Sequence, residues 1–422
     1  MTTLSESRRD FLKTTSIAST ALFIGFNSKG LLAATGSIPK DVFINPFVKI
    51  ERNGVVTVIS KHFEMGQGTT TGLTTLVAEE LDANWLTTKV EFAPADAKRY
   101  KNLFFGVQGT GGSTAMPNSF IQYREAGAAA REVLVKAAAK KWSVSESSIG
   151  VSDGYLFANG NKAHFGEFID EAANFTPSKK PILKDPKNFK FIGNEKLNRK
   201  DNFDKTTGRA MYSSDVKVPG MVYVAIIRSP KFGGTLESFD ASGAKGAVGF
   251  IDAKALPNNT GVAVYGENTW AVFEARKKIT TSWNFFRAET RSTEEMIEDH
   301  KVLLAKPVYQ AKKGYTTEQA VEKLKTADKF VEADFFMPFL AHSPMEPVNC
   351  VIEPTKDGIL LHDACQGPTL VQVRISKMLG LKPEQIQIKT YYAGGSFGRR
   401  LSPTSDYLSE AALAFDLLGR KT

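Results

Sequence analysis

Three short loops of small residues constrain this chain more than any other feature of its sequence. They read MGQG at Met65–Gly68, GTGGST at Gly109–Thr114 and GGSFGRR at Gly394–Arg400. Such small side chains let backbone N–H groups approach a bound group closely, and helix N-termini favour anions. None of the loops has the Gly-Lys-Ser/Thr ending of a P-loop or the GxGxxG dinucleotide pattern. One such loop is usually a turn, but three together predict an extended ligand with phosphate and polar rings.

Strands and helices alternate around the first two loops. The apolar spacing predicts a strand–turn–strand over 45–62, helices over 71–84 and 118–141, and a short strand over 89–92. Residues 142–198 contain several Asn, Pro and Lys residues, a composition that suits a linker or a small satellite.

The second half of the chain has short strands. They are expected at 221–227, 262–264, 333–337, 349–353, 359–364 and 385–391, with helices at 271–278, 368–379 and from about 403. A charged helical connector is expected within 290–325. The pattern as a whole predicts an α+β fold, with helices and strands mixed along the chain.

Composition narrows the class of protein. The chain has 422 residues, 42% of them hydrophobic and 23% charged, which is an ordinary globular composition for two or three domains. The net charge is +9, but no dense Lys/Arg cluster is interleaved with aromatic residues. We therefore interpret the charge as a solvated basic surface and expect no nucleic-acid partner.

The chain has only two cysteines, Cys350 and Cys365. With no CxxC pair and no Cys/His spacing, neither a protein-ligated iron–sulfur cluster nor a structural zinc is expected in this chain. The two cysteines flank a predicted hairpin with its turn at 356–358, and one disulfide between them is conceivable in an oxidising compartment. Two buried free thiols are the preferred interpretation, because the N-terminus indicates folding inside the cell.

The first 35 residues have the pattern of a targeting signal. Residues 7–13 read SRRDFLK, residues 14–26 are mildly apolar, and Ala33-Ala34 offers a cleavage region. This resembles a bacterial twin-arginine signal, which exports folded proteins to the periplasm. The alternative is a basic amphipathic helix. The apolar stretch is too short to span a bilayer, so no transmembrane segment is expected in the mature form.

Further motifs bring the loops together as one family pattern. They are HSPMEPVNC at 342–350, CQGP at 365–368 and DKTTGRAMYSSDVKVPGMVYVAIIRSP at 204–230. Together they resemble the molybdopterin-binding subunit of the xanthine dehydrogenase/aldehyde oxidase superfamily, closest to the isoquinoline 1-oxidoreductase beta subunit and periplasmic aldehyde dehydrogenase type. The resemblance covers nearly all of 43–420. MGQG precedes GGSFGRR here, the permuted order of that branch.

The resemblance implies a domain plan. Residues 1–35 would be the signal, 43–195 the N-terminal part of a molybdopterin-binding domain, and 200–290 an α/β hammerhead domain. Residues 320–422 would begin a second molybdopterin-binding segment and end before it is complete, through truncation or a split reading frame.

The resemblance also implies roles for individual residues. Gln366 would donate a hydrogen bond to an oxygen on the metal, although a surface amide is the alternative. Phe397 would lie beside the metal, or else be a core aromatic. The predicted cofactor-binding residues are Gly66, Gln67, Gly68, Gly112, Ser113, Thr114, Gln366, Gly395, Phe397, Gly398 and Arg399. Because the pterin holds the metal in this family, no protein ligand is predicted, and His342 and Glu346 are expected to be structural.

By resemblance, the cofactor is molybdopterin cytosine dinucleotide. The expected reaction is oxidation of an aldehyde or N-heterocycle with water-derived oxygen. Electrons would pass to a small two-iron two-sulfur subunit and then to an acceptor such as a cytochrome c. In the family that this chain resembles, the catalytic glutamate sits in a glycine-rich loop near the end of a much longer subunit, and no such loop is found after Arg400. The chain alone is therefore expected to be inactive without a C-terminal half; the alternative is a non-catalytic periplasmic binding module.

Overall fold

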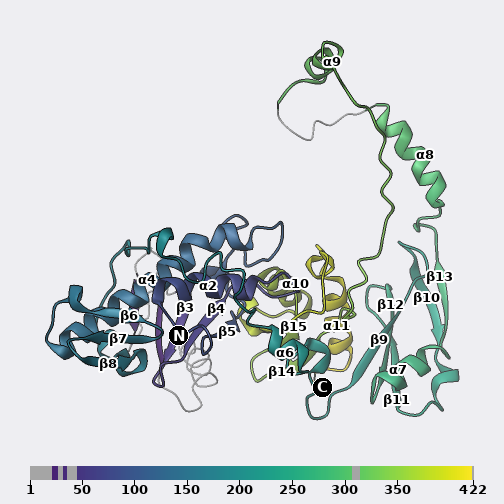
Figure 1. The fold of residues 1–422 in the computed structure, drawn as a ribbon. Helices are drawn as coiled ribbons and strands as arrows, with labels where there is room; N and C mark the ends of the chain where they lie inside the picture. The colour runs from purple at the N-terminus through teal and green to yellow at the C-terminus, as the bar shows by residue number, and fades with distance from the viewer. Residues whose placement is uncertain (1–20, 27–31, 36–44, 307–313, 421–422) are drawn as a thin grey trace. The chain divides into compact units, whose positions relative to one another are not determined.

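A computed structural model describes residues 21–26, 32–35, 45–306 and 314–420 of this chain. The chain divides into two compact units, Met1–Met221 with His342–Thr422, and Val222–Ala341. Each unit contains both helices and strands, so the predicted mixed α+β class is confirmed (Figure 1). Among the described residues, none of the helices is both long and apolar enough to cross a membrane.

The first sheet of the larger unit has five strands in the order β2-β1-β3-β4-β5. Its pairs are antiparallel except for β4 and β5. The strands are β1 (Ala21–Phe26), β2 (Leu32–Thr35), β3 (Asn45–Glu51), β4 (Val56–Ser60) and β5 (Lys89–Phe92). The expected strand–turn–strand at 45–62 is confirmed. β1 and β2 fall within the predicted export signal, and the Arg8 and Arg9 of that signal lie outside the described residues.

Two helices pack together on this sheet, α2 (Thr69–Leu81) and α4 (Ala115–Trp142). Their contact is close because α4 is rich in alanine, and Gly127 lies against the backbone of Val77, where a Cβ would come within 2.7 Å of the Val77 carbonyl oxygen. Phe47, Leu76 and Tyr123 are fully buried in the shared core. The short α3 (Ala97–Tyr100) follows β5. This core fixes the starting points of the first two glycine loops.

Residues 142–198, expected to be a linker or satellite, divide into two structures. The first is a small antiparallel sheet of β6 (Gly150–Ser152), β7 (Tyr155–Ala158) and β8 (Asn161–His164), followed by α5 (Ile169–Ala172). The second, residues 182–194, has no regular secondary structure beyond one short 3-10 turn and crosses α2 and α4; we call it the strap.

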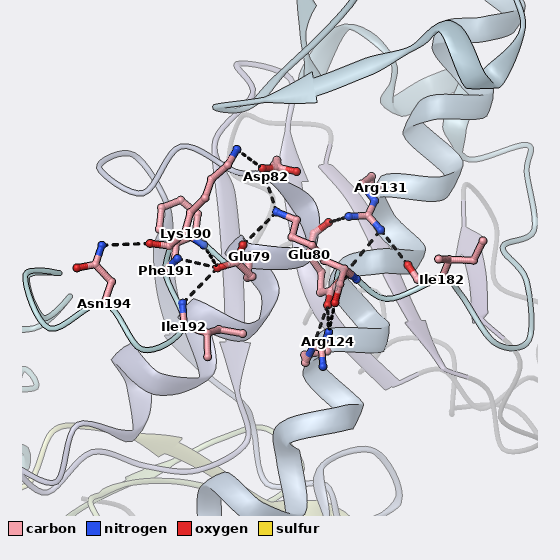
Figure 2. A network of polar contacts seen from close by, with 11 residues as sticks. Glu79, Glu80, Asp82, Arg124, Arg131, Ile182, Lys190, Phe191, Ile192 and Asn194 are labelled. Atoms are coloured by element: carbon pink, nitrogen blue, oxygen red, sulfur yellow. Dashed lines mark hydrogen bonds and ion pairs between the residues drawn. The ribbon is translucent and has the colours of Figure 1, made fainter. Parts of the chain in front are cut away.

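Two buried carboxylates on α2 hold the strap (Figure 2). Glu79 is fully buried, and its Oε2 accepts hydrogen bonds from the backbone amides of Lys190, Phe191 and Ile192 at 2.8, 2.6 and 3.2 Å. Glu80 is also fully buried and accepts from the Lys184 amide at 2.8 Å. The strap therefore has its polar backbone satisfied by acids that the helix supplies, as buried polar groups require.

The second sheet of the larger unit has the order β14-β15-β16. β14 (Val351–Pro354) and β15 (Ile359–Asp363) form the expected antiparallel hairpin, and β16 (Ile386–Thr390) runs parallel to β15. The parallel step requires a crossover connection, which α10 (Pro368–Leu379) provides. With α11 (Asp406–Leu417), α10 covers one face and buries Ile359, Leu361 and Ile388.

The smaller unit is built on two antiparallel sheets. One sheet contains β11 (Phe250–Ala255), β12 (Gly261–Gly266) and β9 (Tyr223–Arg228), and the other pairs β10 (Thr235–Asp240) with β13 (Thr280–Asn284). α7 (Thr269–Arg276) packs on β9 and β12. Two further helices are α8 (Thr293–Leu304) and α9 (Thr317–Lys325), while α6 (Asn202–Thr206) belongs to the larger unit.

The predicted strand at 333–337 is wrong. Residues 327–341 have no regular secondary structure, and Phe335 is 85% exposed. The alternating pattern favours a strand locally, but a strand needs a neighbour to pair its N–H and C=O groups. Within the described residues, none of the strands pairs with this segment.

A buried acid between the second sheet and α11 predicts a pH-dependent stability. Asp363 is fully buried, and burial raises its pKa to about 6, although Tyr407 donates a hydrogen bond to it at 3.0 Å. The folded state therefore binds this proton more tightly than the unfolded chain does. This stabilisation is complete below about pH 4 and is lost as the pH rises to about 6, a decrease of about 3 kcal/mol.

Urea unfolding between pH 4 and 7.5 measures that decrease. Asp363→Asn should flatten the profile in this window, whereas Asp357→Asn, in the exposed hairpin turn, should leave it unchanged. The same slope in wild type and Asp363→Asn would assign the pH dependence to other groups.

Candidate functional site

The three glycine loops meet around Thr110 and Gln366. The Thr110 amide donates to the Gln366 carbonyl at 2.8 Å, and the Gln366 side-chain Nε2 donates to the Thr110 carbonyl at 2.8 Å. Gln366 Oε1 accepts a hydrogen bond from the hydroxyl of Ser396 in GGSFGRR. Thr110 Oγ1 in turn accepts from the amide of Phe63, beside MGQG, at 3.3 Å. One buried glutamine and one threonine thus connect segments more than 250 residues apart.

His62 lies where the loops meet, and the sequence did not single it out. It is buried, with Nδ1 3.1 Å from Thr110 Oγ1 and Nε2 3.1 Å from the side-chain amide of Asn118. Burial, with a further contribution from the neighbouring Lys61, lowers the pKa of His62 to about 3. Because the Asn118 amide nitrogen donates, Nε2 accepts and Nδ1–H points to Thr110. Its position just after an apolar strand was the available signal.

The MGQG loop is filled by a carboxylate of its own chain. Glu64 is fully buried; its Oε1 accepts from the amides of Gly66 and Gly68, each at 2.9 Å. Its Oε2 accepts from the Thr70 amide at 3.1 Å and hydroxyl at 2.9 Å. The Gln67 side chain turns back, donating to the Phe63 carbonyl at 2.9 Å. The amides expected to face a ligand are therefore engaged internally, while Gly66 and Gln67 remain at the surface.

Arg199 fastens this loop from outside. It donates to the Gly66 carbonyl at 3.0 Å and to Glu64 at 3.2 Å, and it forms a two-point contact with Asp201. Burial opposes ionisation of Asp201, but hydrogen bonds from Arg199 and Lys205 outweigh it and lower the pKa of Asp201 to about 2. Asp201 therefore stays anionic and keeps Arg199 in place.

The GTGGST loop presents free donors. Gly112 and Ser113 are exposed with φ of +56° and +54°, and they lie just before the 28-residue α4. Within the described part of the chain, neither of their amides has an acceptor. The Thr114 hydroxyl, by contrast, donates to the Gly111 carbonyl at 2.7 Å. Unpaired amides at the start of a long helix are suited to phosphate.

The GGSFGRR loop exposes its aromatic residue. Phe397 is 71% exposed with φ of +55°, so the core interpretation of this ring is wrong. Gly395 and Gly398 on either side also have positive φ, +90° and +94°, a conformation that glycine adopts without strain. Arg399 makes a two-point contact with Asp406 at 2.8 and 2.7 Å.

Arg400 and Glu346 support this loop from behind. Arg400 is 2% exposed, and its Nη2 lies 2.8 Å from Glu346 Oε2, which also accepts from the Gly394 amide at 2.9 Å. Glu346 therefore has the structural role expected for it. Arg400 Nη1 is buried with no hydrogen-bond partner among the described residues. Among those same residues, none of the clusters of His, Cys, Asp and Glu has the composition of a metal site.

A cavity of about 10 Å³ lies beside the start of the GTGGST loop, bordered by His62, Gly109, Thr110 and Cys365. That space holds about one water molecule. The loops consequently form a wall with exposed donors rather than an enclosed pocket. Cys350 and Cys365 are both free thiols, and burial raises the pKa of each.

Comparison with known proteins identifies the family to which this chain belongs. Two family models, each described as a molybdopterin cofactor-binding domain, match residues 21–222 and 304–422, together more than half of the chain. The chain belongs to the molybdopterin-binding oxidoreductases of the xanthine dehydrogenase/aldehyde oxidase superfamily.

Two relatives illustrate the family. The chain is 28% identical to isoquinoline 1-oxidoreductase subunit beta of Brevundimonas diminuta, over 94% of this chain and 56% of the relative. It is also 28% identical to a membrane-bound aldehyde dehydrogenase (pyrroloquinoline-quinone) of Gluconacetobacter polyoxogenes, over 98% of this chain and 54% of the relative. The chain thus spans about half the length of these relatives. The structure of quinoline 2-oxidoreductase from Pseudomonas putida 86 aligns with a TM-score of 0.41 and 17% identity, over 52% of this chain and 33% of that chain.

The residues at the wall fit a molybdopterin cofactor in two respects. The free amides of Gly112 and Ser113 suit its phosphate, and Arg400 Nη1 is a buried cationic donor left without an acceptor. The Arg400 charge is paired with Glu346, but leaving Nη1 buried without an acceptor is costly, so this nitrogen is available to an acceptor atom of a bound group. Gln366 also keeps one amide hydrogen beyond the bond to Thr110, because a side-chain amide nitrogen carries two.

Proposed function

We propose that this chain holds molybdopterin cytosine dinucleotide as part of a molybdenum hydroxylase. The enzyme oxidises an aldehyde or an N-heterocycle with water-derived oxygen. Relatives whose names specify isoquinoline, nicotinate or aldehyde oxidation support this choice. The observation that carries the proposal is the buried contact of Gln366 with both Thr110 and Ser396, because it joins the GTGGST and GGSFGRR loops at one point, while Thr110 also contacts Phe63 beside MGQG.

We assign the cofactor-contacting roles from the family resemblance, and the geometry of the loops supports them. Gly112 and Ser113 would bind phosphate, while Gln366, Gly395, Phe397 and Gly398 would border the metal-bearing end. Gly66, Gln67 and Gly68 would contact the pterin through their exposed atoms. Thr114 and Arg399 would act indirectly, since the Thr114 hydroxyl and the Arg399 guanidinium are engaged within the protein. When bound, the molybdenum cofactor supplies two-electron oxidation chemistry.

Neither acid beside the loops is assigned the role of general base. Glu64 accepts from three amides and a hydroxyl, and Glu346 is bonded to Arg400 and the Gly394 amide. A general base must be free to reach the proton it takes. Both carboxylates instead keep the loops in shape.

We propose that electrons leave through a small subunit with two iron–sulfur clusters and pass to an acceptor such as a cytochrome c. Two relatives are named as subunits, which supports a multi-subunit assembly. This chain has only Cys350 and Cys365, and both are free thiols. Purified native complex should therefore contain iron in a second polypeptide; turnover without iron would exclude this partner.

We also propose export to the periplasm by the twin-arginine route, supported by SRRDFLK at 7–13. Replacing Arg8 and Arg9 by Lys should abolish export, as measured by cell fractionation and N-terminal sequencing. Normal periplasmic amounts of the variant would refute the proposed export signal. The sequencing also locates the mature N-terminus relative to β1, which begins at Ala21.

The proposed cofactor site is tested by Gln366→Ala. Expression with the molybdenum cofactor-loading machinery should give molybdenum and releasable CMP in the wild type. The variant loses two buried hydrogen bonds and leaves the Thr110 carbonyl and Ser396 unpaired, so its molybdenum content should fall about tenfold. Gln372→Ala is a matched control, because Gln372 also donates to backbone carbonyls in the same unit, at 2.8 Å to Ile386. Wild-type chain without molybdenum, or equal contents in Gln366→Ala, would refute the site.

A further inference from the structure

A groove of about 350 Å³ lies on the second sheet, on the face opposite α10 and α11. Side chains alternate along each strand, so His362 and Lys389 face this groove while Leu361 and Ile388 face the helices. The opposing wall is formed by Met211 and residues 216–219. Nothing described above for the cofactor uses this groove.

A chain of three polar side chains lies at its base. Glu353 Oε2 lies 3.1 Å from His362 Nε2, and His362 Nδ1 lies 2.9 Å from the Tyr391 hydroxyl. His362 and Tyr391 are only 6% and 7% exposed. An anionic Glu353 fixes the imidazole tautomer, because it requires a proton on Nε2. Nδ1 then accepts, and the Tyr391 hydroxyl donates to it.

The groove combines positive charge with apolar surface. Lys389 lies with its Nζ 5.4 Å from the centre of the Tyr391 ring, and Lys217 is exposed on the opposing wall. Glu353 is the only acid of the lining, and it already contacts His362. Met211 and Val216 supply apolar surface. We propose that the groove binds a small carboxylate with an apolar body, its carboxylate accepting from Lys389 and the Tyr391 hydroxyl.

Binding of this kind is coupled to a proton. Burial lowers the pKa of His362 in the free chain; Glu353 raises it and Lys389 lowers it. The other groups facing His362 across the groove are Tyr391 and Lys217. For the Tyr391 hydroxyl to turn to a ligand, His362 must take a proton from solvent and donate Nδ1–H to the Tyr391 oxygen. The added negative charge of the ligand favours that imidazolium, so affinity rises as the pH falls.

Titration calorimetry with benzoate tests the proposal on the chain without molybdenum, so its outcome is independent of the proposed enzyme function. In two buffers of different ionisation enthalpy, wild type should show net proton uptake from the buffer on binding at pH 7. Lys389→Ala should weaken Kd about tenfold, and Tyr391→Phe should bind without proton uptake. Lys377→Ala, an exposed lysine on α10, should match wild type.

Phosphate separates the carboxylate proposal from simple anion binding, because it has the charge without the apolar body. It should bind at least about tenfold more weakly than benzoate. Equal affinity for both ions, or an unchanged Kd in Lys389→Ala, would overturn the proposal, as would no saturable heat with wild type. If a variant does not fold, the wild-type His362 resonance decides: it is one of five histidines and must shift to a higher pKa with benzoate.

Discussion

Glu80→Ala is expected to lower the free energy of unfolding by about 3–5 kcal/mol. The Glu80 side chain is fully buried and lies 2.7 Å from Nη2 of Arg124, which is itself 8% exposed (Figure 2). It also accepts from the Lys184 amide at 2.8 Å. Removing it leaves a buried guanidinium without its counterion and frees one end of the strap. Urea denaturation measures the loss, and limited proteolysis within 182–194 should accelerate.

The matched control is Glu132→Ala on α4. Glu132 pairs with Lys136 at 2.6 Å and accepts from Ser178, but the Glu132 and Lys136 side chains are about a fifth exposed, so water can replace these contacts and the loss should stay below about 1 kcal/mol. A second variant, Glu80→Leu with Arg124→Leu, should recover much of the stability because neither charge of this pair is then left buried without the other. A loss below about 1 kcal/mol for Glu80→Ala would show that Arg124 is solvated by another route.

Glu64→Ala is expected to cost a similar amount and to disable the first glycine loop. Three amides, the Thr70 hydroxyl and Arg199 all converge on this one carboxylate. Without it, these donors are left buried or must be rehydrated, at about 1–3 kcal/mol for each one that stays unsatisfied. The loss of loop shape should also reduce molybdenum content on cofactor loading, well beyond the fall in folded protein.

Two variants control this prediction. Glu91→Ala removes an acid from the neighbouring β5 whose side chain is 43% exposed and pairs with Lys49 at 3.3 Å; Lys49 keeps Glu51 at 4.0 Å, so the substitution should cost little. Glu64→Gln keeps the volume but places an amide donor against loop donors, and should recover only part of the stability. Wild-type stability and metal content in Glu64→Ala would show that water can replace the carboxylate.

Local patterns identified the elements and the family. Alternation at 45–62, the helical spacing before Leu81 and the hairpin around Gly358 all correspond to observed elements, because each depends on neighbours along the chain. The strand predicted at 333–337 is absent for the opposite reason: a strand depends on a partner strand, which a local pattern does not reveal. The strap was similarly hidden, because its backbone is satisfied by Glu79 and Glu80, about 100 residues earlier.

The sequence by itself therefore determined the residue types of the site: small loops, a helix start, a glutamine before a proline and a pair of arginines. Only the tertiary structure decided which of their donors are available. Glu64 occupies the MGQG amides, Asp406 holds Arg399, and His62 joins the set. These pairings join residues far apart in the chain or depend on which way a side chain points. Composition and spacing reveal only which groups a residue has for hydrogen bonding. Gly112 and Ser113 remain free because they lie in the turn just before α4, where no carbonyl oxygen of the described residues accepts from their amides.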